Sequence, residues 1–176
     1  MTPVKTAAAR TAEGAIVFTD IVGFTEFTAL RGDDAALDLL SAQDRIVQET
    51  LDEKGRVVKA LGDGLMLWFS DACTAVRTAL KLQERFEKHS QNEDTPLWVR
   101  MGVHYGRAAQ RGEDLIGHDV NVAARIVTLA APGEVLISET CTPEVGDAGD
   151  IELEEVGPTV MKGIPDPVSL YRATWA

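Results

Sequence analysis

Two aspartates each lie just after a short run of apolar residues. Asp20 comes after residues 15–18, and Asp63 stands between two glycines that separate the apolar segments 56–61 and 65–69. Short apolar runs predict buried strands, and Asp-Gly between two such runs predicts a hairpin turn. When these strands pair, two carboxylates meet at one edge of the sheet. Because neighbouring carboxylates repel each other, such a pair favours a bound divalent cation.

The residues that follow Asp20 add a second kind of binding group. Gly23 predicts a turn and Thr25 opens a helical pattern, so the backbone N–H groups of a helix start would lie beside the carboxylate. Such groups hold phosphate oxygens, and a cation ligand beside them favours metal-dependent phosphoryl or nucleotidyl transfer. The alternatives are structural: Asp20 caps the helix, and Asp63 serves only a tight turn. The pattern by itself leaves both interpretations open.

The composition excludes several classes of partner. The chain has 176 residues, of which 45% are hydrophobic, enough for one domain with its own core. A net charge of −11 argues against non-specific binding to nucleic acids or anionic membranes, which needs a basic surface. No apolar run approaches the roughly 18 residues of a membrane-spanning helix. We therefore expect no nucleic-acid partner and no membrane segment in this chain.

The start of the chain differs from the rest. The first thirteen residues carry Lys5 and Arg10 but no apolar core, so they are unlike a signal peptide. We interpret residues 1–13 as a flexible lead-in and residues 14–176 as a single domain. The two cysteines, Cys73 and Cys141, show no metal or redox spacing, which favours a reducing, cytoplasmic location.

Two long amphipathic helices are predicted. The first is expected to use Asp33 or Asp34 as its N-cap. Its apolar stripe is expected to consist of Leu37, Leu40, Val47 and Leu51, with Asp44 interrupting it. The second helix follows Ser70 and Asp71, and its apolar face is expected to consist of Ala72, Ala75, Val76, Ala79, Leu82 and Phe86.

The second half of the chain adds further strands and a shorter helix. Residues 97–106 alternate apolar and polar side chains like a half-buried strand, with residues 108–116 as its hairpin partner. A helix is expected over residues 121–130, and short strands over 134–138 and 151–175. This order predicts an α+β fold: a ferredoxin-like βαββαβ core with extra strands, its helices packed on a mostly antiparallel sheet.

Five segments, taken together, resemble the class III nucleotidyl cyclases, the catalytic domains of adenylyl and guanylyl cyclases. They occur in the family's order and span nearly the whole chain, so the combined match is far more specific than any one of them. The segments are Phe18-Thr-Asp-Ile-Val-Gly-Phe-Thr25, Lys59-Ala-Leu-Gly-Asp-Gly64, Arg100-Met-Gly-Val-His-Tyr-Gly106, Asp114-Leu-Ile-Gly-His-Asp-Val-Asn-Val-Ala-Ala-Arg125 and Met161-Lys-Gly163.

The resemblance implies a site with two divalent cations, Mg²⁺ or Mn²⁺. Asp20 and Asp63 would hold both ions, with the backbone carbonyl of Ile21 as a further ligand. Phe24 and Thr25 would present their backbone N–H groups to phosphate.

The resemblance also implies which base is recognised. Lys59 and Asp114 look like the pair that reads adenine, since a lysine can donate to N1 and an aspartate can accept from the N6 amino group. Guanine presents a carbonyl and an N–H at those edges, so this pair would be mismatched against it. Ala124, a small residue near the base position, fits the adenine interpretation.

Four further polar residues resemble groups that act on the ribose and phosphates. Asn121 and Arg125 lie four apart on the predicted helix and share a face. The resemblance implies that Asn121 orients the ribose and that Arg125 neutralises charge on the α-phosphate. Arg100 and Lys162 resemble the cations that hold the β- and γ-phosphates. Without the resemblance, these residues would be a surface polar pair, an outward strand residue and a loop lysine.

Sites of this family lie between two subunits arranged head to tail. Asp20, Asp63 and Arg100 would come from one subunit. The other subunit would contribute Lys59, Asp114, Asn121, Arg125 and Lys162. Because this chain carries both halves, a homodimer with two equivalent sites is the simplest assembly. The expected reaction is that of an adenylyl cyclase: two-metal, in-line attack of the ribose 3′-OH of ATP, giving 3′,5′-cyclic AMP and pyrophosphate.

Three alternatives remain. The chain could be a guanylyl cyclase, or a catalytically silent module that binds nucleotide and dimerises. A diguanylate cyclase ranks last, because the sequence has no Gly-Gly-Asp/Glu-Glu-Phe signature. The three histidines, His89, His104 and His118, are not clustered, and only His118 lies near residues expected to contact substrate.

Overall fold

The computed structural model describes residues 10–92 and 95–176 of the chain. The fold is a central sheet with the strand order β2-β3-β1-β4-β6-β8-β7, to which β5 is added by pairing with β4. All strand pairs are antiparallel except β4 with β6. The strands are β1 (Thr11–Ile21), β2 (Gly55–Leu61), β3 (Gly64–Phe69), β4 (Val99–Arg111), β5 (Asp114–Ile116), β6 (Val135–Ser138), β7 (Ile151–Thr159) and β8 (Val168–Trp175).

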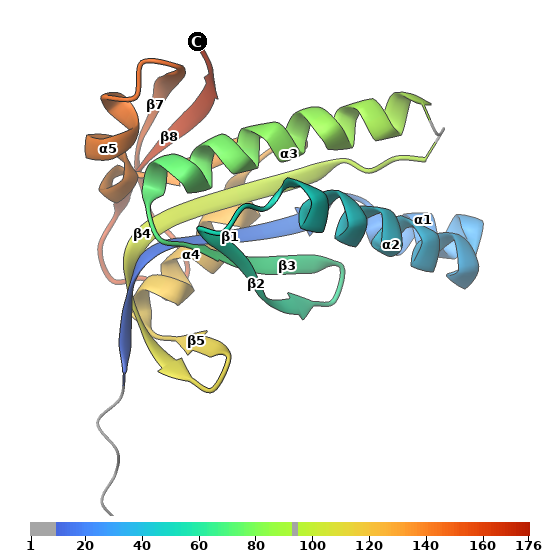
Figure 1. Ribbon diagram of the computed structural model, residues 1–176, viewed down its shortest axis with the longest axis horizontal. Helices are drawn as coiled ribbons and strands as arrows, with labels where there is room; N and C mark the ends of the chain where they lie inside the picture. The colour runs from blue at the N-terminus through green and yellow to red at the C-terminus, as the bar shows by residue number, and fades with distance from the viewer. Residues whose placement is uncertain (1–9, 93–94) are drawn as a thin grey trace, which may run out of the picture.

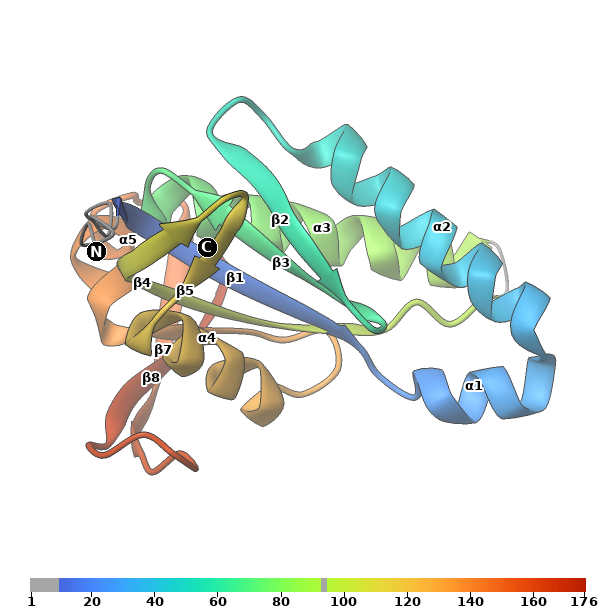
Figure 2. The same cartoon turned by 90° about the horizontal axis from the view of Figure 1, so that it is seen from below.

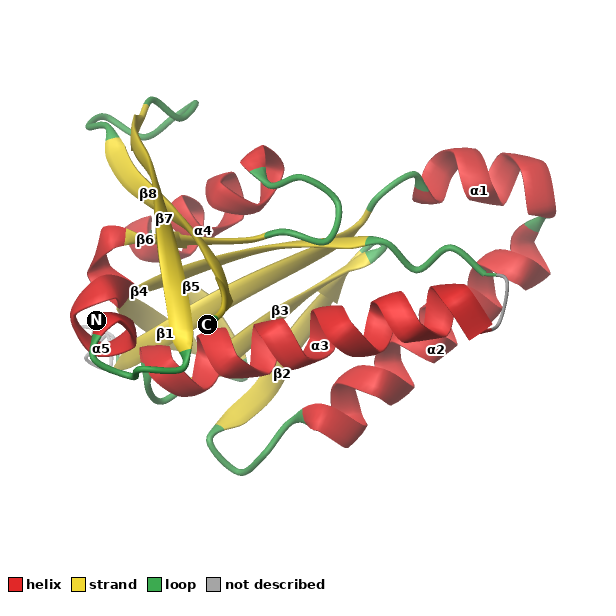
Figure 3. Ribbon diagram, turned by 90° about the horizontal axis from the view of Figure 1, so that it is seen from above, coloured by secondary structure: helices red, strands yellow, loops and turns green. Residues whose placement is uncertain are grey.

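The helices cover both faces of this sheet. Figures 1 and 3 show α2 (Asp33–Thr50) and α3 (Ala72–Asn92) over one face, and Figure 2 shows α4 (His118–Leu129) on the other. The helix α1 (Phe24–Arg31) extends beyond the end of the sheet, while η1 (Glu139–Cys141) and α5 (Thr142–Gly146) follow β6. This arrangement confirms the predicted α+β class and the βαββαβ order. No helix among the described residues is long and apolar enough to cross a membrane.

The alternation of side chains along β1 supplies both layers of the core. Ala15 and Val17 pack in the large cluster with α2 and α3, whereas Ile16 and Phe18 pack in the cluster beneath α4. Because the middle of β1 is buried on both faces, its sequence from Ala15 to Phe18 is continuously apolar rather than alternating. The six residues predicted for the apolar face of α3 are all buried, from Ala72 to Phe86.

The long pairing of β1 with β4 corrects two expectations. Residues 11–13, assigned above to the flexible lead-in, form the start of β1 because their backbone pairs with Arg107, Ala108 and Ala109. Because this pairing reaches Ala109, β4 continues beyond the predicted end at residue 106 as far as Arg111. The hairpin partner predicted over residues 108–116 is therefore only the three residues of β5. The rest of the predicted lead-in, residues 1–9, lies outside the described residues.

The first long helix also differs from its prediction. It begins at Asp33 with Gly32 in the N-cap position and no side-chain cap, so neither Asp33 nor Asp34 is the N-cap. The predicted apolar stripe is confirmed only in part: Val47 is buried and Leu40 and Leu51 pack against the core, but Leu37 is 61% exposed. The residues of α2 that are buried are Ala36, Leu39, Gln43, Ile46 and Val47. Gln43 is polar but lies in the middle of the buried face, so the apolar pattern did not predict this face correctly.

Three strand ends meet at the edge of the sheet next to α1 (Figure 2): the end of β1, the β2–β3 turn and the start of β4. The turn fits closely against β1. Thr19 pairs with Leu65, and the hydroxyl of Thr19 accepts a hydrogen bond from the backbone N–H of Leu65 at 3.0 Å. A Cβ atom placed on Gly64 would lie 2.1 Å from the carbonyl oxygen of Thr19. A glycine is therefore required for this contact.

The Gly64→Ala substitution should destabilise the protein by about 2 kcal/mol or more, because the new methyl group must push the hairpin away from β1. Gly146→Ala is the matched control, since a Cβ there meets nothing within 4 Å. It should leave the free energy of unfolding within about 1 kcal/mol of the parent. Urea unfolding of the three proteins measures the difference, and equal stabilities would contradict the close fit.

Candidate active site

The structure brings Asp20 and Asp63 together at this edge of the sheet. Asp20 is the penultimate residue of β1, and Asp63 lies in the β2–β3 turn beside it. Burial raises the pKa of Asp63, and the neighbouring carboxylate of Asp20 raises it further. Ionised, the two groups repel each other, so a cation between them would be favoured as the pH rises above the pKa of Asp63.

Arg100 compensates this pair in the structure. It lies directly opposite Asp20 in the β1–β4 register, and its Nη2 and Nε atoms donate to one carboxylate oxygen of Asp20 at 2.7 and 2.9 Å. Its Nη1 donates to the carbonyl oxygen of Thr128 near the end of α4, at 3.1 Å. Asp20 does not cap α1, because that helix has Gly23 at its N-cap and no side-chain cap.

The donor set fits a hard divalent cation. Within residues 10–92 and 95–176, no group of three or more His, Cys, Asp or Glu side chains could hold a metal ion. The chain thus offers two carboxylates and backbone oxygens, and Mg²⁺ typically takes one or two carboxylates together with water and substrate phosphates. The carbonyl of Ile21 as a ligand remains a prediction.

The start of α1 lies immediately beyond the carboxylate pair. Gly23 adopts a left-handed conformation with φ of 74°, which turns the chain from β1 into the helix. The backbone N–H groups of Phe24 and Thr25 belong to the first turn, where helical geometry supplies no acceptor. Their role in phosphate binding is consistent with this position and remains a prediction.

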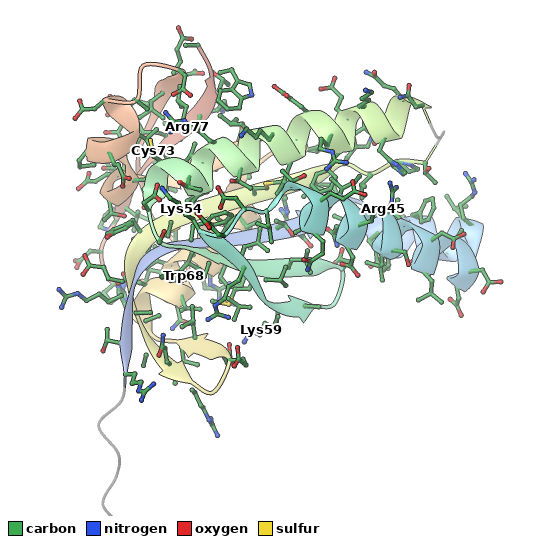
Figure 4. The ribbon with its side chains drawn as sticks, viewed as in Figure 1. Arg45, Lys54, Lys59, Trp68, Cys73 and Arg77 are labelled. Carbon is green, nitrogen blue, oxygen red and sulfur yellow. The ribbon has the colours of Figure 1, made fainter. Side chains whose placement is uncertain are left out.

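Lys59 and Asp114 form an ion pair. The lysine Nζ lies 3.0 Å from one carboxylate oxygen and 3.1 Å from the other, although the residues are 55 positions apart in the chain. Figure 4 shows Lys59 on the β2–β3 hairpin beside the β4–β5 hairpin. The hydrogen bond from Lys59, followed by that from the backbone N–H of Leu115, lowers the pKa of Asp114. Asp114 is therefore an acceptor at neutral pH.

The remaining predicted residues surround one hollow. Its volume is about 400 Å³, and its lining includes Asn121, Ala124, Arg125, Lys162 and Gly163. Asn121 and Arg125 lie on the exposed face of α4, and Lys162 lies in the β7–β8 connection. Neither the carboxylate pair with Arg100 nor the Lys59–Asp114 pair is part of this lining. The predicted site residues of one chain thus fall into three groups.

A buried histidine holds the start of α4, and sequence reasoning missed it. The Nε2 atom of His104 lies 2.8 Å from Asp119, and its Nδ1 atom lies 2.7 Å from the hydroxyl of Ser138. Because a carboxylate only accepts, Nε2 carries the proton and Nδ1 accepts from the serine hydroxyl. The second oxygen of Asp119 accepts from the backbone N–H of Arg107 at 2.8 Å. The network fixes α4 two residues before Asn121.

Glycines on β4 permit this close approach. A Cβ on Gly102 would lie 2.5 Å from the backbone nitrogen of Val127, and a Cβ on Gly106 would lie 2.3 Å from the Asp119 carboxylate. His104 lies between these two glycines on the same face of the strand. That spacing is the sequence signal that could have pointed to a helix packed directly over the histidine.

The network makes the stability depend on pH. Burial lowers the pKa of His104, and this effect outweighs the opposing influence of Asp119. The unfolded chain therefore binds more protons than the folded one between the lowered pKa and about 6.5. The stability that neutral His104 contributes is complete above about pH 6.5 and is lost as the pH falls through this window.

The His104→Gln variant should have a shallower pH dependence of unfolding than the parent between pH 5 and 6.5. One proton accounts for up to about 1.4 kcal/mol per pH unit. His89→Gln, at the end of α3 and outside the network, is the control and should keep the parent's slope. Denaturant unfolding at four or five pH values measures the slopes, and an unchanged slope for His104→Gln would show that His104 does not titrate in this way.

Comparison with known proteins identifies relatives along almost the whole chain. The model of the adenylate and guanylate cyclase catalytic domain matches residues 6–173. A Rhizobium meliloti protein named as a candidate adenylate cyclase is 36% identical over 166 residues, which cover 92% of this chain and 28% of that protein. A pH-sensitive adenylate cyclase of Mycobacterium tuberculosis is 30% identical over 160 residues, which cover 89% of this chain and 39% of that protein. The chain thus spans well under half the length of these relatives.

The fold is also found among solved structures. The crystal structure of the adenylyl cyclase CyaB from P. aeruginosa superposes with a TM-score of 0.83 at 25% identity, and the match covers 96% of both chains. An adenylate/guanylate cyclase/hydrolase from Silicibacter pomeroyi shares the fold with a TM-score of 0.77 at 23% identity, covering 96% of this chain and 98% of that one.

Proposed function

The chain belongs to the adenylate and guanylate cyclase catalytic domain family, and we propose that it converts ATP to 3′,5′-cyclic AMP and pyrophosphate. The observation that carries the choice of ATP is the Lys59–Asp114 ion pair, which offers a donor and an acceptor side by side. Adenine presents an acceptor at N1 and a donor at N6, so the pair matches it. Guanine would leave polar groups mismatched, which is costly in a binding site.

Asp20 and Asp63 are proposed to bind two divalent cations, Mg²⁺ or Mn²⁺. When bound, these ions neutralise phosphate charge and favour ionisation of the ribose 3′-OH. The other proposed contacts to the phosphates come from the protein itself. Arg100 exchanges part of its contact with Asp20 for the β- and γ-phosphates, and the backbone N–H groups of Phe24 and Thr25 add hydrogen bonds to phosphate.

The hollow on α4 supplies groups for the reacting end of the nucleotide. Asn121 is proposed to orient the ribose, and Arg125 to stabilise the charge that develops on the α-phosphate as the 3′ oxygen attacks in line. Lys162, in the same hollow, is proposed to bind the outgoing pyrophosphate. Ala124 leaves space for the base.

We propose that each complete site is shared between two copies of the chain. The carboxylate pair and the α4 hollow are separate in one chain, and a single nucleotide has to contact both groups of residues. A two-fold homodimer with head-to-tail contacts would place the carboxylates of one subunit opposite the hollow of the other, and would create two equivalent sites.

Incubation of the purified chain with ATP or GTP and either Mg²⁺ or Mn²⁺, followed by mass analysis of the products, tests the proposal. Cyclic AMP should form from ATP, and Asp20→Ala should lower the rate by about a hundredfold or more. Asp147→Ala, which removes an exposed aspartate near α5, is the control and should keep the parent's rate. Faster turnover of GTP would favour a guanylyl cyclase, and ATP binding without any cyclic product would favour a silent module.

Mixing two inactive variants tests the shared site. Asp20→Ala lacks a carboxylate and Asn121→Ala lacks the ribose contact, so each homodimer should be inactive. Random pairing gives about half mixed dimers, in which one of the two sites is intact, so the mixture should regain roughly a quarter of the parent's activity per total protein. As a control, light scattering must show that both variants are folded dimers before they are mixed. An inactive mixture under those conditions would contradict sharing.

A further inference from the structure

A buried glutamine contacts the turn that carries Asp63. Gln43 lies on the inner face of α2 and is only 1% exposed. Its side-chain nitrogen Nε2 donates a hydrogen bond to the backbone carbonyl oxygen of Asp63 at 3.3 Å. Its oxygen Oε1 is buried and has no hydrogen-bond partner among residues 10–92 and 95–176. Every other buried position of this helix holds an apolar residue.

The orientation of the amide follows from the carbonyl that it meets. A backbone carbonyl only accepts hydrogen bonds, so the NH₂ group of Gln43 faces Asp63 and Oε1 is left in the interior. A buried acceptor without a partner is destabilising. A methionine of similar size would fill the same space without that cost. Packing alone therefore does not account for a glutamine at this position.

The hydrogen bond from Gln43 holds the β2–β3 turn from the side of α2, in addition to its contacts with β1. Gly64 fits against the Thr19 carbonyl in β1, and Gly62, with φ of 62°, gives the turn its left-handed conformation. These contacts hold the turn from the side of β1 and of its own hairpin. The hydrogen bond from α2 adds a second anchor at the residue whose carboxylate faces Asp20.

We propose that Gln43 is a positioning residue for Asp63, holding its main chain so that the carboxylate stays beside Asp20 in a geometry that binds a divalent cation. The inference rests on the proposed function, in which these two carboxylates are the cation ligands. Gln43 acts only through Asp63 and does not touch the cation. Because the NH₂ group of Gln43 must face the Asp63 carbonyl, its Oε1 atom is left without a hydrogen-bond partner among the described residues.

The Gln43→Met variant tests the proposal by separating stability from cation binding. It removes the donor and the orphaned acceptor while retaining a long side chain. Unfolding by urea should show a stability equal to or higher than the parent's. Binding of Mn²⁺ alone, measured by electron paramagnetic resonance of the free ion, should weaken about tenfold or more, the usual effect of losing a group that orients a metal ligand.

Leu39→Ala is the matched control, because Leu39 lies one turn earlier on the same buried face of α2 and makes no hydrogen bond to the turn. This variant should be less stable than the parent yet bind Mn²⁺ within about twofold of it. Parent-like Mn²⁺ affinity in Gln43→Met would overturn the proposal. An equal loss in Leu39→Ala would also overturn it, since the effect would then come from helix packing.

A third variant, Asp63→Asn, distinguishes failure of this inference from failure of the proposed function. When Asp63→Asn loses Mn²⁺ binding and Gln43→Met does not, only the positioning role is wrong. If Asp63→Asn binds Mn²⁺ as tightly as the parent, the proposed cation site is wrong. The positioning role of Gln43 is then wrong as well.

Discussion

The site depends on holding two like-charged carboxylates at one edge of a sheet. Burial raises the pKa of Asp63 and the repulsion from Asp20 raises it further, and the structure opposes this repulsion. The β1–β4 register places Arg100 opposite Asp20. The absence of a side chain at Gly64 lets the hairpin lie directly against β1, where the hydrogen bond from Leu65 to Thr19 holds it. In the proposed function, the repulsion between these carboxylates favours a divalent cation bound between them.

The position of α4 is the second constraint, and it follows from the same strand that carries Arg100. Gly102 and Gly106 let the helix approach β4 within backbone contact, and the His104–Asp119 network fixes its first turn. The inner face of α4, with Val122, Ala123 and Ile126, is therefore buried in the core. Asn121 and Arg125 are consequently exposed, where the proposed substrate and second subunit could reach them.

The charge distribution is compatible with the polyanionic substrate proposed above, although the protein is acidic. The net charge is −11, yet the cations expected to meet the nucleotide are placed individually rather than as a basic surface. Two of them, Arg100 and Lys59, are already paired with aspartates in the structure. These ion pairs keep the cations oriented, and in the proposed function a bound nucleotide would share or replace their contacts with the aspartates.

The sequence by itself determined the α+β class, the strand-end placement of Asp20 and Asp63, and the apolar face of α3, because local periodicity and turn chemistry encode these features. It also identified the residues around the α4 hollow, through their resemblance to a family. Only the tertiary structure decided the buried face of α2, the Arg100–Asp20 pair and the hydrogen bonds of His104 and Gln43. These depend on partners 15 to 80 residues away. A polar side chain that finds its partner across the fold has no signature in local sequence, and in a periodic pattern it resembles a surface residue.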